Sequence, residues 1–105
     1  MSNARIALTT AGSAEEARRI AQALVDRRLA ACVNIVPQVE SIYRWQEKVE
    51  NASEFLLLIK TDAGVFEPLC EAIKELHSYQ LPECLMLEIR AGSSEYLDWI
   101  EENVG

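Results

Sequence analysis

Two spacings of apolar residues alternate along this chain, and they predict strands and helices in turn. Short apolar runs with strand-like composition are followed by segments in which apolar residues recur every three or four positions. The expected strands cover 4–10, 31–45, 50–61 and 84–90. The expected helices cover 14–28 and 62–77, and a third, capped by Ser93 or Ser94, ends at 104. The order is β-α-β-β-α-β and then a short C-terminal helix. That order predicts a ferredoxin-like α+β sandwich, in which both main helices cover one face of an antiparallel sheet.

Individual residues indicate where some of these elements begin or bend. Ser13, with Glu16 three residues later, predicts a reciprocal capping box at the start of the first helix. Pro37 cannot donate a hydrogen bond to a neighbouring strand, so it favours an edge strand or a bulge. Pro68 fits poorly inside a helix, so the second helix either begins near Phe66 or is kinked there.

The second and third strands predict an extended hairpin. The hairpin that they form could span nearly twice the length of an ordinary strand, which has about 5–6 residues. The two main helices would cover only part of this hairpin, so Ile42, Tyr43 and Trp45 and the unpaired strand edges would be left exposed. We therefore expect copies of the chain to associate through strand contacts.

Composition and charge exclude several classes of protein. The 105 residues are half apolar and 26% charged, which is typical of one ordinary globular domain spanning 1–105. The net charge of −7, with scattered basic residues, argues against nucleic acids and anionic membranes as partners. No apolar run is long enough for a membrane span or a signal peptide. Three cysteines without paired spacing indicate reduced thiols and a cytoplasmic location.

His77 is the only histidine, and it begins the stretch HSYQLPE between a helix and a strand. Three roles are open to it: a turn residue that hydrogen-bonds the backbone at the end of the helix, a ligand in a metal or other binding site, or a general base. No nucleophile motif, phosphate-binding loop or histidine-rich metal motif accompanies it. An enzyme is therefore the least favoured class of protein.

Five further residues could line a binding site near the hairpin. Tyr43, Trp45 and Tyr79 are aromatic side chains with polar tips near expected strand ends and turns. Such residues suit either interface packing or stacking against a ligand. Glu54 and Lys60 flank the most apolar strand, where a charge either ends the strand in solvent or binds a substrate.

Several segments together resemble the CutA divalent-cation-tolerance proteins, and the resemblance extends over essentially the whole chain. The segments are LAACVNIVP at 29–37, SIYRWQ at 41–46, EFLLLIKT at 54–61, HSYQLPE at 77–83 and YLDWI at 96–100. The resemblance implies a ferredoxin-like subunit that forms a homotrimer through β-strand contacts and is related in shape to the PII signalling proteins. It also implies a link to tolerance of divalent cations, with Cu²⁺ or another divalent cation as the bound ion.

The resemblance also implies which positions would bind copper. In members to which copper binding is attributed, the ligands are a cysteine in the first strand and two adjacent histidines at the end of the second helix. Here Thr9 and Leu76 occupy two of these positions, and only His77 matches. The family often has a glycine after the tryptophan, where this chain has Glu47, so we expect a different hairpin turn.

The expected function is that of a cytoplasmic, homotrimeric and non-enzymatic binding or regulatory module. Its expected site is an intersubunit cleft with His77 as ligand or hydrogen-bond donor, Lys60 as an anion partner, Glu54 beside them and the three aromatic residues as walls. Two alternatives remain open: a PII-like sensor that holds an anionic metabolite in the same cleft, and a structural trimer without a ligand.

Overall fold

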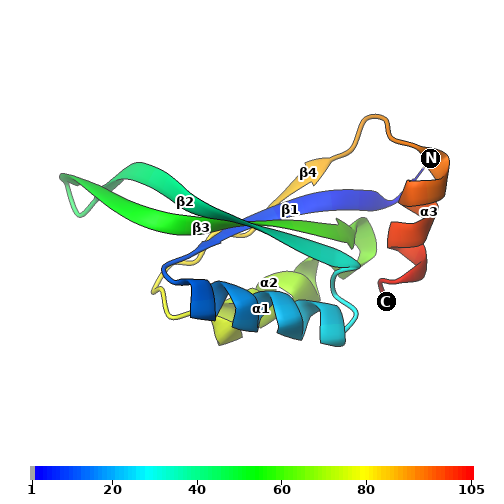
Figure 1. Cartoon of the computed structure of the whole chain (residues 1–105), viewed down its shortest axis with the longest axis horizontal. Coiled ribbons are helices and arrows are strands. Elements are labelled where there is room, and N and C mark those ends of the chain that lie inside the picture. The colour runs from blue at the N-terminus through cyan, green and yellow to red at the C-terminus, as the bar shows by residue number, and fades with distance from the viewer. Residues whose placement is uncertain (1) are drawn as a thin grey trace.

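The computed structural model describes residues 2–105, in which two helices cover one face of a four-stranded antiparallel sheet (Figure 1). The strands are β1 (Ala4–Ala11), β2 (Cys32–Trp45), β3 (Lys48–Asp62) and β4 (Leu85–Glu88). The helices are α1 (Ala14–Asp26), α2 (Phe66–Leu76) and α3 (Ser94–Glu102), and a 3₁₀ turn (Ala63–Val65) precedes α2. The strand order is β2-β3-β1-β4. The predicted ferredoxin-like fold, the long hairpin and the C-terminal helix are confirmed.

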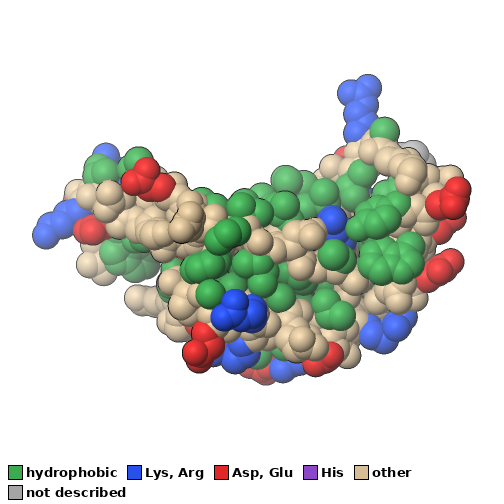
Figure 2. Space-filling view, in the orientation of Figure 1, with side chains coloured by type: hydrophobic (Ala, Val, Ile, Leu, Met, Phe, Trp, Pro, Cys, Tyr) green, Lys and Arg blue, Asp and Glu red, His purple; other side chains and the backbone are tan. Residues whose placement is uncertain are grey.

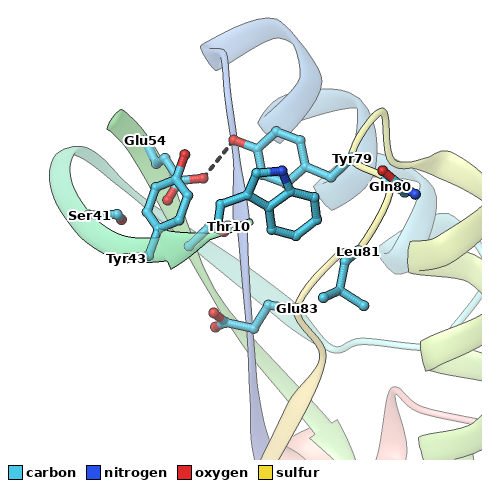
Figure 3. Close-up of a pocket in the computed structure, with 9 residues that line it drawn as sticks. Thr10, Ser41, Tyr43, Glu54, Tyr79, Gln80, Leu81 and Glu83 are labelled. Atoms are coloured by element: carbon cyan, nitrogen blue, oxygen red, sulfur yellow. Dashed lines mark hydrogen bonds between the residues drawn. The ribbon is translucent and has the colours of Figure 1, made fainter. Parts of the chain in front are cut away.

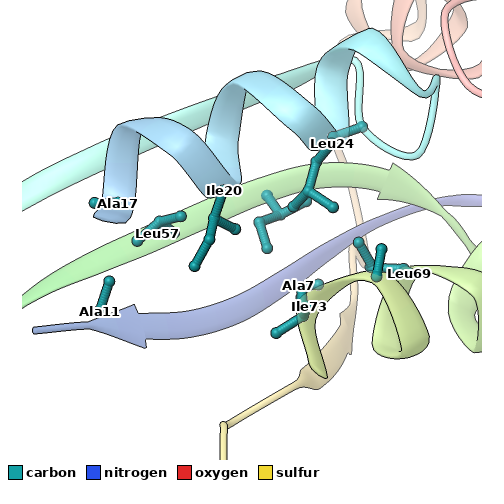
Figure 4. Packing of buried hydrophobic residues seen from close by; sticks show 11 residues of the cluster. Ala7, Ala11, Ala17, Ile20, Leu24, Leu57, Leu69 and Ile73 are labelled. Carbon is teal, nitrogen blue, oxygen red and sulfur yellow. The ribbon is translucent and has the colours of Figure 1, made fainter. Parts of the chain in front are cut away.

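The hydrophobic core lies between the sheet and the helices α1 and α2 (Figure 4). Alternate residues of β1 and β3 face the helices, because side chains along a strand point to opposite faces. Burying each large aliphatic side chain there stabilises the fold by roughly 2 kcal/mol. The fully buried members of this layer include Ala7, Ala11, Leu57, Ile59, Ile20, Leu24, Leu69 and Ile73.

The opposite face of the sheet also carries apolar side chains, although neither main helix covers it. These residues face one another across the strands, as in the pairs Leu8–Leu58 and Leu8–Leu85. Figure 2 shows apolar side chains gathered in the hollow between the hairpin and α3. Leu85 and Leu87 remain 55% and 49% exposed. We call this set the open-face row; it consists of Ile6, Leu8, Val36, Leu56, Leu58, Leu85 and Leu87.

A β-bulge interrupts the pairing of β2 with β3. Val36 pairs with Leu56 and Val39 pairs with Glu54, so Pro37 and Gln38 together lie opposite the single residue 55. Gln38 has a positive φ of 59°, and β2 is an edge strand. The prediction that Pro37 marks an edge or a bulge is therefore confirmed, since the residue is at both.

Beyond the bulge the hairpin extends well past α1 and α2 (Figure 1). It ends in a two-residue turn at Gln46 and Glu47, whose φ angles are 49° and 69°. Positive φ at both central residues is the signature of a type I′ turn, whose twist matches that of the flanking strands. The turn has this geometry without a glycine.

The second helix begins where the first of the two sequence alternatives placed it, at Phe66. Asp62 caps the preceding 3₁₀ turn by accepting a 2.7 Å hydrogen bond from the Gly64 amide. Pro68 is the third residue of α2. Amide hydrogens in the first turn of a helix have no intrahelical acceptor. Proline therefore costs the helix no hydrogen bond there.

Other boundaries differ from the expected ones by a few residues. The first helix ends at Asp26 and not at 28, because Arg28 adopts the left-handed conformation with φ 57°. Strand β4 pairs with β1 only over Leu85–Glu88, shorter than the expected 84–90. Helix α3 follows Ser93, one of the two expected caps, and it ends at Glu102, two residues before the expected end.

Candidate functional site

A pocket of about 450 Å³ opens beside the hairpin (Figure 3). Four residues singled out in the sequence come together in it: Tyr43, Trp45, Glu54 and Tyr79. We call it the hairpin pocket. Its full lining is Thr10, Ser41, Tyr43, Trp45, Glu54, Tyr79, Gln80, Leu81 and Glu83.

The β-bulge determines which side chains of β2 reach the hairpin pocket. Before the bulge, Val36 shares its face of the sheet with Leu56 of β3. At the bulge two residues of β2 lie opposite one residue of β3, so the alternation of side chains between the two faces shifts by one position. After the bulge, Tyr43 and Trp45 therefore share the face that carries Glu54. An uninterrupted β2 would have placed Ile42 and Arg44 there. The extra residue therefore turns the aromatic side chains toward the pocket.

A short hydrogen bond links the two sides of the hairpin pocket. The hydroxyl of Tyr79 donates to Glu54 Oε2 over 2.6 Å (Figure 3). Glu54 is only 8% exposed. Burial, the hydrogen bond to Glu54 and the negative charge of Glu54 all raise the pKa of Tyr79 above its ordinary value. The phenol therefore stays protonated, and thus a donor, at neutral pH.

His77 lies behind Tyr79 and does not face the pocket. It follows the last residue of α2, and its side chain is fully buried. Its Nε2 donates to the carbonyl of Thr10, and its Nδ1 accepts a 3.1 Å hydrogen bond from the Tyr79 amide. Both ring nitrogens are thus bound to backbone groups, as in the first of the three roles open to this residue. His77 fixes the loop after α2 to the end of β1 and thereby positions Tyr79.

The carboxylate of Glu16 supports the same loop from α1. Its Oε2 accepts a 3.0 Å hydrogen bond from the Ser78 amide, and its Oε1 lies 3.9 Å from His77 Nδ1. Burial acts to raise the pKa of Glu16, but the hydrogen bonds from Ser78 and the neighbouring His77 ring lower it below its ordinary value. The expected capping box is only half formed. Ser13 accepts from the Glu16 amide over 3.1 Å, while the Glu16 carboxylate binds Ser78.

Lys60 is absent from the pocket that it was expected to share. It lies six residues beyond Glu54 on β3, which corresponds to roughly 20 Å along a strand. Its Nζ lies 5.5 Å from the centroid of the Tyr96 ring in α3. Within one subunit Lys60 therefore lies apart from the aromatic residues of the pocket, and its role as an anion partner in an intersubunit cleft stays a prediction.

The three positions implied for copper do not offer a matching set of donor atoms. Leu76 has no donor atom, and both nitrogens of His77 are occupied. Thr9 is fully buried, and its Oγ1 has no hydrogen-bond partner within 2–105. A neutral hydroxyl is a poor replacement for a thiolate in copper binding. Among the described residues, no group of three histidine, cysteine or acidic side chains could hold a metal ion. Metal binding by His77 stays a prediction.

Sequence reasoning missed two residues that shape the site. Glu83 lines the hairpin pocket, and it ends the stretch HSYQLPE that had been singled out for its histidine. Gly12 lies against Tyr79, where an added Cβ would come within 3.1 Å of the phenol oxygen. An interrupted apolar run was the only signal at Gly12. In the part of the chain that the structure covers, no helix is long and apolar enough to cross a membrane.

The strand order and the overhanging hairpin define a ferredoxin-like α+β protein with a pocket between the hairpin and the loop after α2. The profile of the CutA1 divalent ion tolerance proteins matches residues 5–103. The chain therefore belongs to this family, and the resemblance drawn from its motifs is confirmed.

Individual relatives agree with this assignment. The divalent-cation tolerance protein CutA of Thermus thermophilus is 54% identical over 95% of this chain and 97% of its own length. Its solved structure superposes with a TM-score of 0.95 at 53% identity, covering 97% of this chain and 99% of that one. The structure of CutA from Archaeoglobus fulgidus, described as a periplasmic divalent cation tolerance protein, has a TM-score of 0.93 at 41% identity, covering 97% and 99%. Mouse CutA is 40% identical over 91% of this chain but only 54% of its own length.

Proposed function

We propose that this chain forms a homotrimeric, non-enzymatic binding module that acts in divalent-cation tolerance. The family supplies the link to divalent cations. The observation that carries the binding role is the hairpin pocket, in which a buried carboxylate lies among three aromatic side chains. Pockets of about 300–1,000 Å³ are typical of small-molecule sites, and this one is about 450 Å³.

Self-association is supported by the open-face row and by the edges of the sheet. β2 and β4 are both edge strands. β4 pairs with β1 only at Arg5–Leu8, so the segment 9–11 of β1 has no strand partner on that side within the described chain. Natural proteins cover such edges, and a contiguous apolar surface marks an interaction site. Copies of the hairpin and of the open-face row would cover one another.

The non-enzymatic role and a cytoplasmic location are supported by His77 and by the cysteines. His77 is the only histidine in the chain, and both of its nitrogens hold backbone groups, so it is not a free base for the pocket. The three cysteines are free thiols. Free thiols persist in the reducing environment of the cytoplasm.

A second candidate is a sensor of small molecules, related in shape to PII, in which the occupant of the pocket and not a metal ion triggers the response. The size and aromatic walls of the hairpin pocket favour this candidate. The sequence argument for an anionic ligand relied on Lys60. Within one subunit, Lys60 lies beside Tyr96 and not in this pocket.

Light scattering and calorimetry test the proposed function. We expect a mass of three 11.8 kDa chains, which Leu87→Glu in the open-face row lowers and which Val25→Glu, on the outer side of α1, leaves unchanged. A monomeric wild type would contradict the trimer. Titration with Cu²⁺ compares the wild type with His77→Ala. Uptake that the substitution abolishes would make His77 a ligand, and uptake that it leaves unchanged would favour the sensor.

A further inference from the structure

The lining of the hairpin pocket has an unequal balance of charge. Of its nine residues, Glu54 and Glu83 are acidic and none is basic. Just outside the lining, cross-strand pairing places Glu50 opposite Tyr43 and Lys48 opposite Trp45, so one base accompanies a third acid. Within one subunit, the lining therefore matches a ligand with a positive charge better than an anion.

Aromatic side chains supply most of the remaining wall. Tyr43 and Trp45 come from the hairpin, and Tyr79 comes from the loop after α2. Figure 3 shows Tyr43 and Glu54 on one side of the pocket, with Tyr79 across from them and Leu81 and Glu83 on the remaining side. The faces of aromatic rings attract cations, and tryptophan attracts them most strongly. Cages of such rings recognise alkylated ammonium groups.

The buried carboxylate of Glu54 is oriented by Tyr79 before any ligand binds. Glu54 Oε2 accepts the hydrogen bond from Tyr79, while Oε1 accepts none from residues 2–105. Because this carboxylate is only 8% exposed, most of its water is already removed when the protein folds. Binding of a cation therefore costs little further desolvation of Glu54. The tyrosine bond also fixes the carboxylate against one wall, which leaves its second oxygen for the ligand.

From these observations we infer that the hairpin pocket binds a small organic cation, with its ammonium head group among Tyr43, Trp45 and Tyr79 and its charge balanced by Glu54 and Glu83. This inference rests on the proposed binding function and assigns the chemical class of its ligand. The same class includes alkylated amines and amino compounds with a free ammonium group.

Choline chloride and its neutral isostere 3,3-dimethyl-1-butanol test the inference. Trp99→Phe is the parent protein, so that Trp45 is the only tryptophan and its fluorescence reports the pocket. We expect saturable binding of choline about tenfold tighter than that of the neutral isostere. In this parent, Glu54→Gln and Tyr43→Leu should each weaken choline binding by about tenfold. Glu40→Gln removes the same charge from the other face of β2 and should leave binding unchanged.

Several outcomes would overturn the inference. They are equal binding of choline and the isostere, no binding of choline, equal losses in Glu54→Gln and Glu40→Gln, and tighter binding of ATP than of choline. Circular dichroism of each variant separates a lost site from a lost fold. Failure of choline with a trimeric mass and intact Cu²⁺ uptake would remove only the ligand class. A monomeric mass together with no uptake of either Cu²⁺ or choline would remove the proposed function.

Discussion

Tyr79 and Glu54 are joined by a 2.6 Å hydrogen bond that connects the loop after α2 to β3. The two residues are 25 positions apart in the chain, and they meet because His77 and Glu16 hold the loop against the end of β1. The loop and the hairpin are thus tied together at the pocket itself. Stability and ligand binding consequently depend on the same side chains.

Replacing Tyr79 with phenylalanine tests this connection. Tyr79→Phe leaves the buried Glu54 carboxylate without its donor, and we expect a loss of about 2 kcal/mol in the free energy of unfolding. Urea denaturation measures the loss. Tyr96→Phe is the matched control, because Tyr96 is 43% exposed. Equal losses in the two variants would show that the hydrogen bond contributes nothing.

The close approach of Gly12 to Tyr79 gives a second prediction. A Cβ at residue 12 would lie 3.1 Å from the phenol oxygen and 3.5 Å from Cε1 of the same ring. Gly12→Ala should therefore displace the ring and destabilise the protein by about 1–2 kcal/mol. The cost should fall in the Tyr79→Phe background, where the nearest atom is gone. Additive losses in the double mutant would contradict a steric cause.

The lowered pKa of Glu16 predicts how stability changes in acid. The folded-state pKa lies below the ordinary 4.5, so the contribution of Glu16 is complete above that value. It is lost as the pH falls below 4.5 and through the folded-state pKa. Glu16→Gln should therefore flatten the decline in stability below pH 4.5, as measured by urea unfolding over a pH series. Glu15→Gln, one residue earlier on an exposed face, should leave the decline unchanged.

Cys70 and Cys84 are placed to form a disulfide when the protein is oxidised. Their sulfur atoms lie 2.8 Å apart, and they join α2 to the segment before β4. Burial and the neighbouring Cys70 raise the pKa of Cys84 to about 12, so exchange with oxidised glutathione should be slow at neutral pH and faster in alkali. Closing a loop of this size should stabilise the fold by about 3 kcal/mol.

Mass spectrometry after incubation with oxidised glutathione measures this disulfide. The intramolecular product lacks two hydrogen atoms, and both glutathione thiols leave in reduced form. Cys70→Ser should abolish the product, whereas Cys32→Ser should retain it. A mixed disulfide with glutathione that persists on Cys70 even in alkali, where Cys84 forms its thiolate, would mean that the two sulfur atoms do not meet in solution.

The hairpin turn offers a stabilising substitution. Glu47 has a φ of 69°, which is unfavourable for any residue with a Cβ. Glu47→Gly should raise the free energy of unfolding by about 1 kcal/mol. Glu50→Gly, in the extended part of β3, should lower it by roughly 0.5–1 kcal/mol. Thermal unfolding of the two variants should therefore shift in opposite directions.

Local patterns in the sequence predicted the fold because they depend on neighbouring residues. The position of Pro37 at an edge strand was predictable from its missing amide hydrogen. The consequence of the bulge was less predictable, because a register shift depends on how two strands pair. His77 gave no sign of its partner, since the Thr10 carbonyl lies 67 positions away. The sequence did not show that Lys60 and Glu54 lie far apart within one subunit, because they are at opposite ends of the same apolar run.

The bulge at Pro37 and Gln38 also divides the molecule mechanically. On one side of it, the sheet is fastened to two helices and holds Tyr79 through His77 and Glu16. On the other side, Tyr43 and Trp45 stand on a two-stranded arm that neither main helix covers (Figure 1). One wall of the pocket is therefore fixed to the helices, while the other lies on the part of the hairpin beyond the bulge. A molecule that binds the outer surface of this two-stranded arm would therefore also set the width of the pocket.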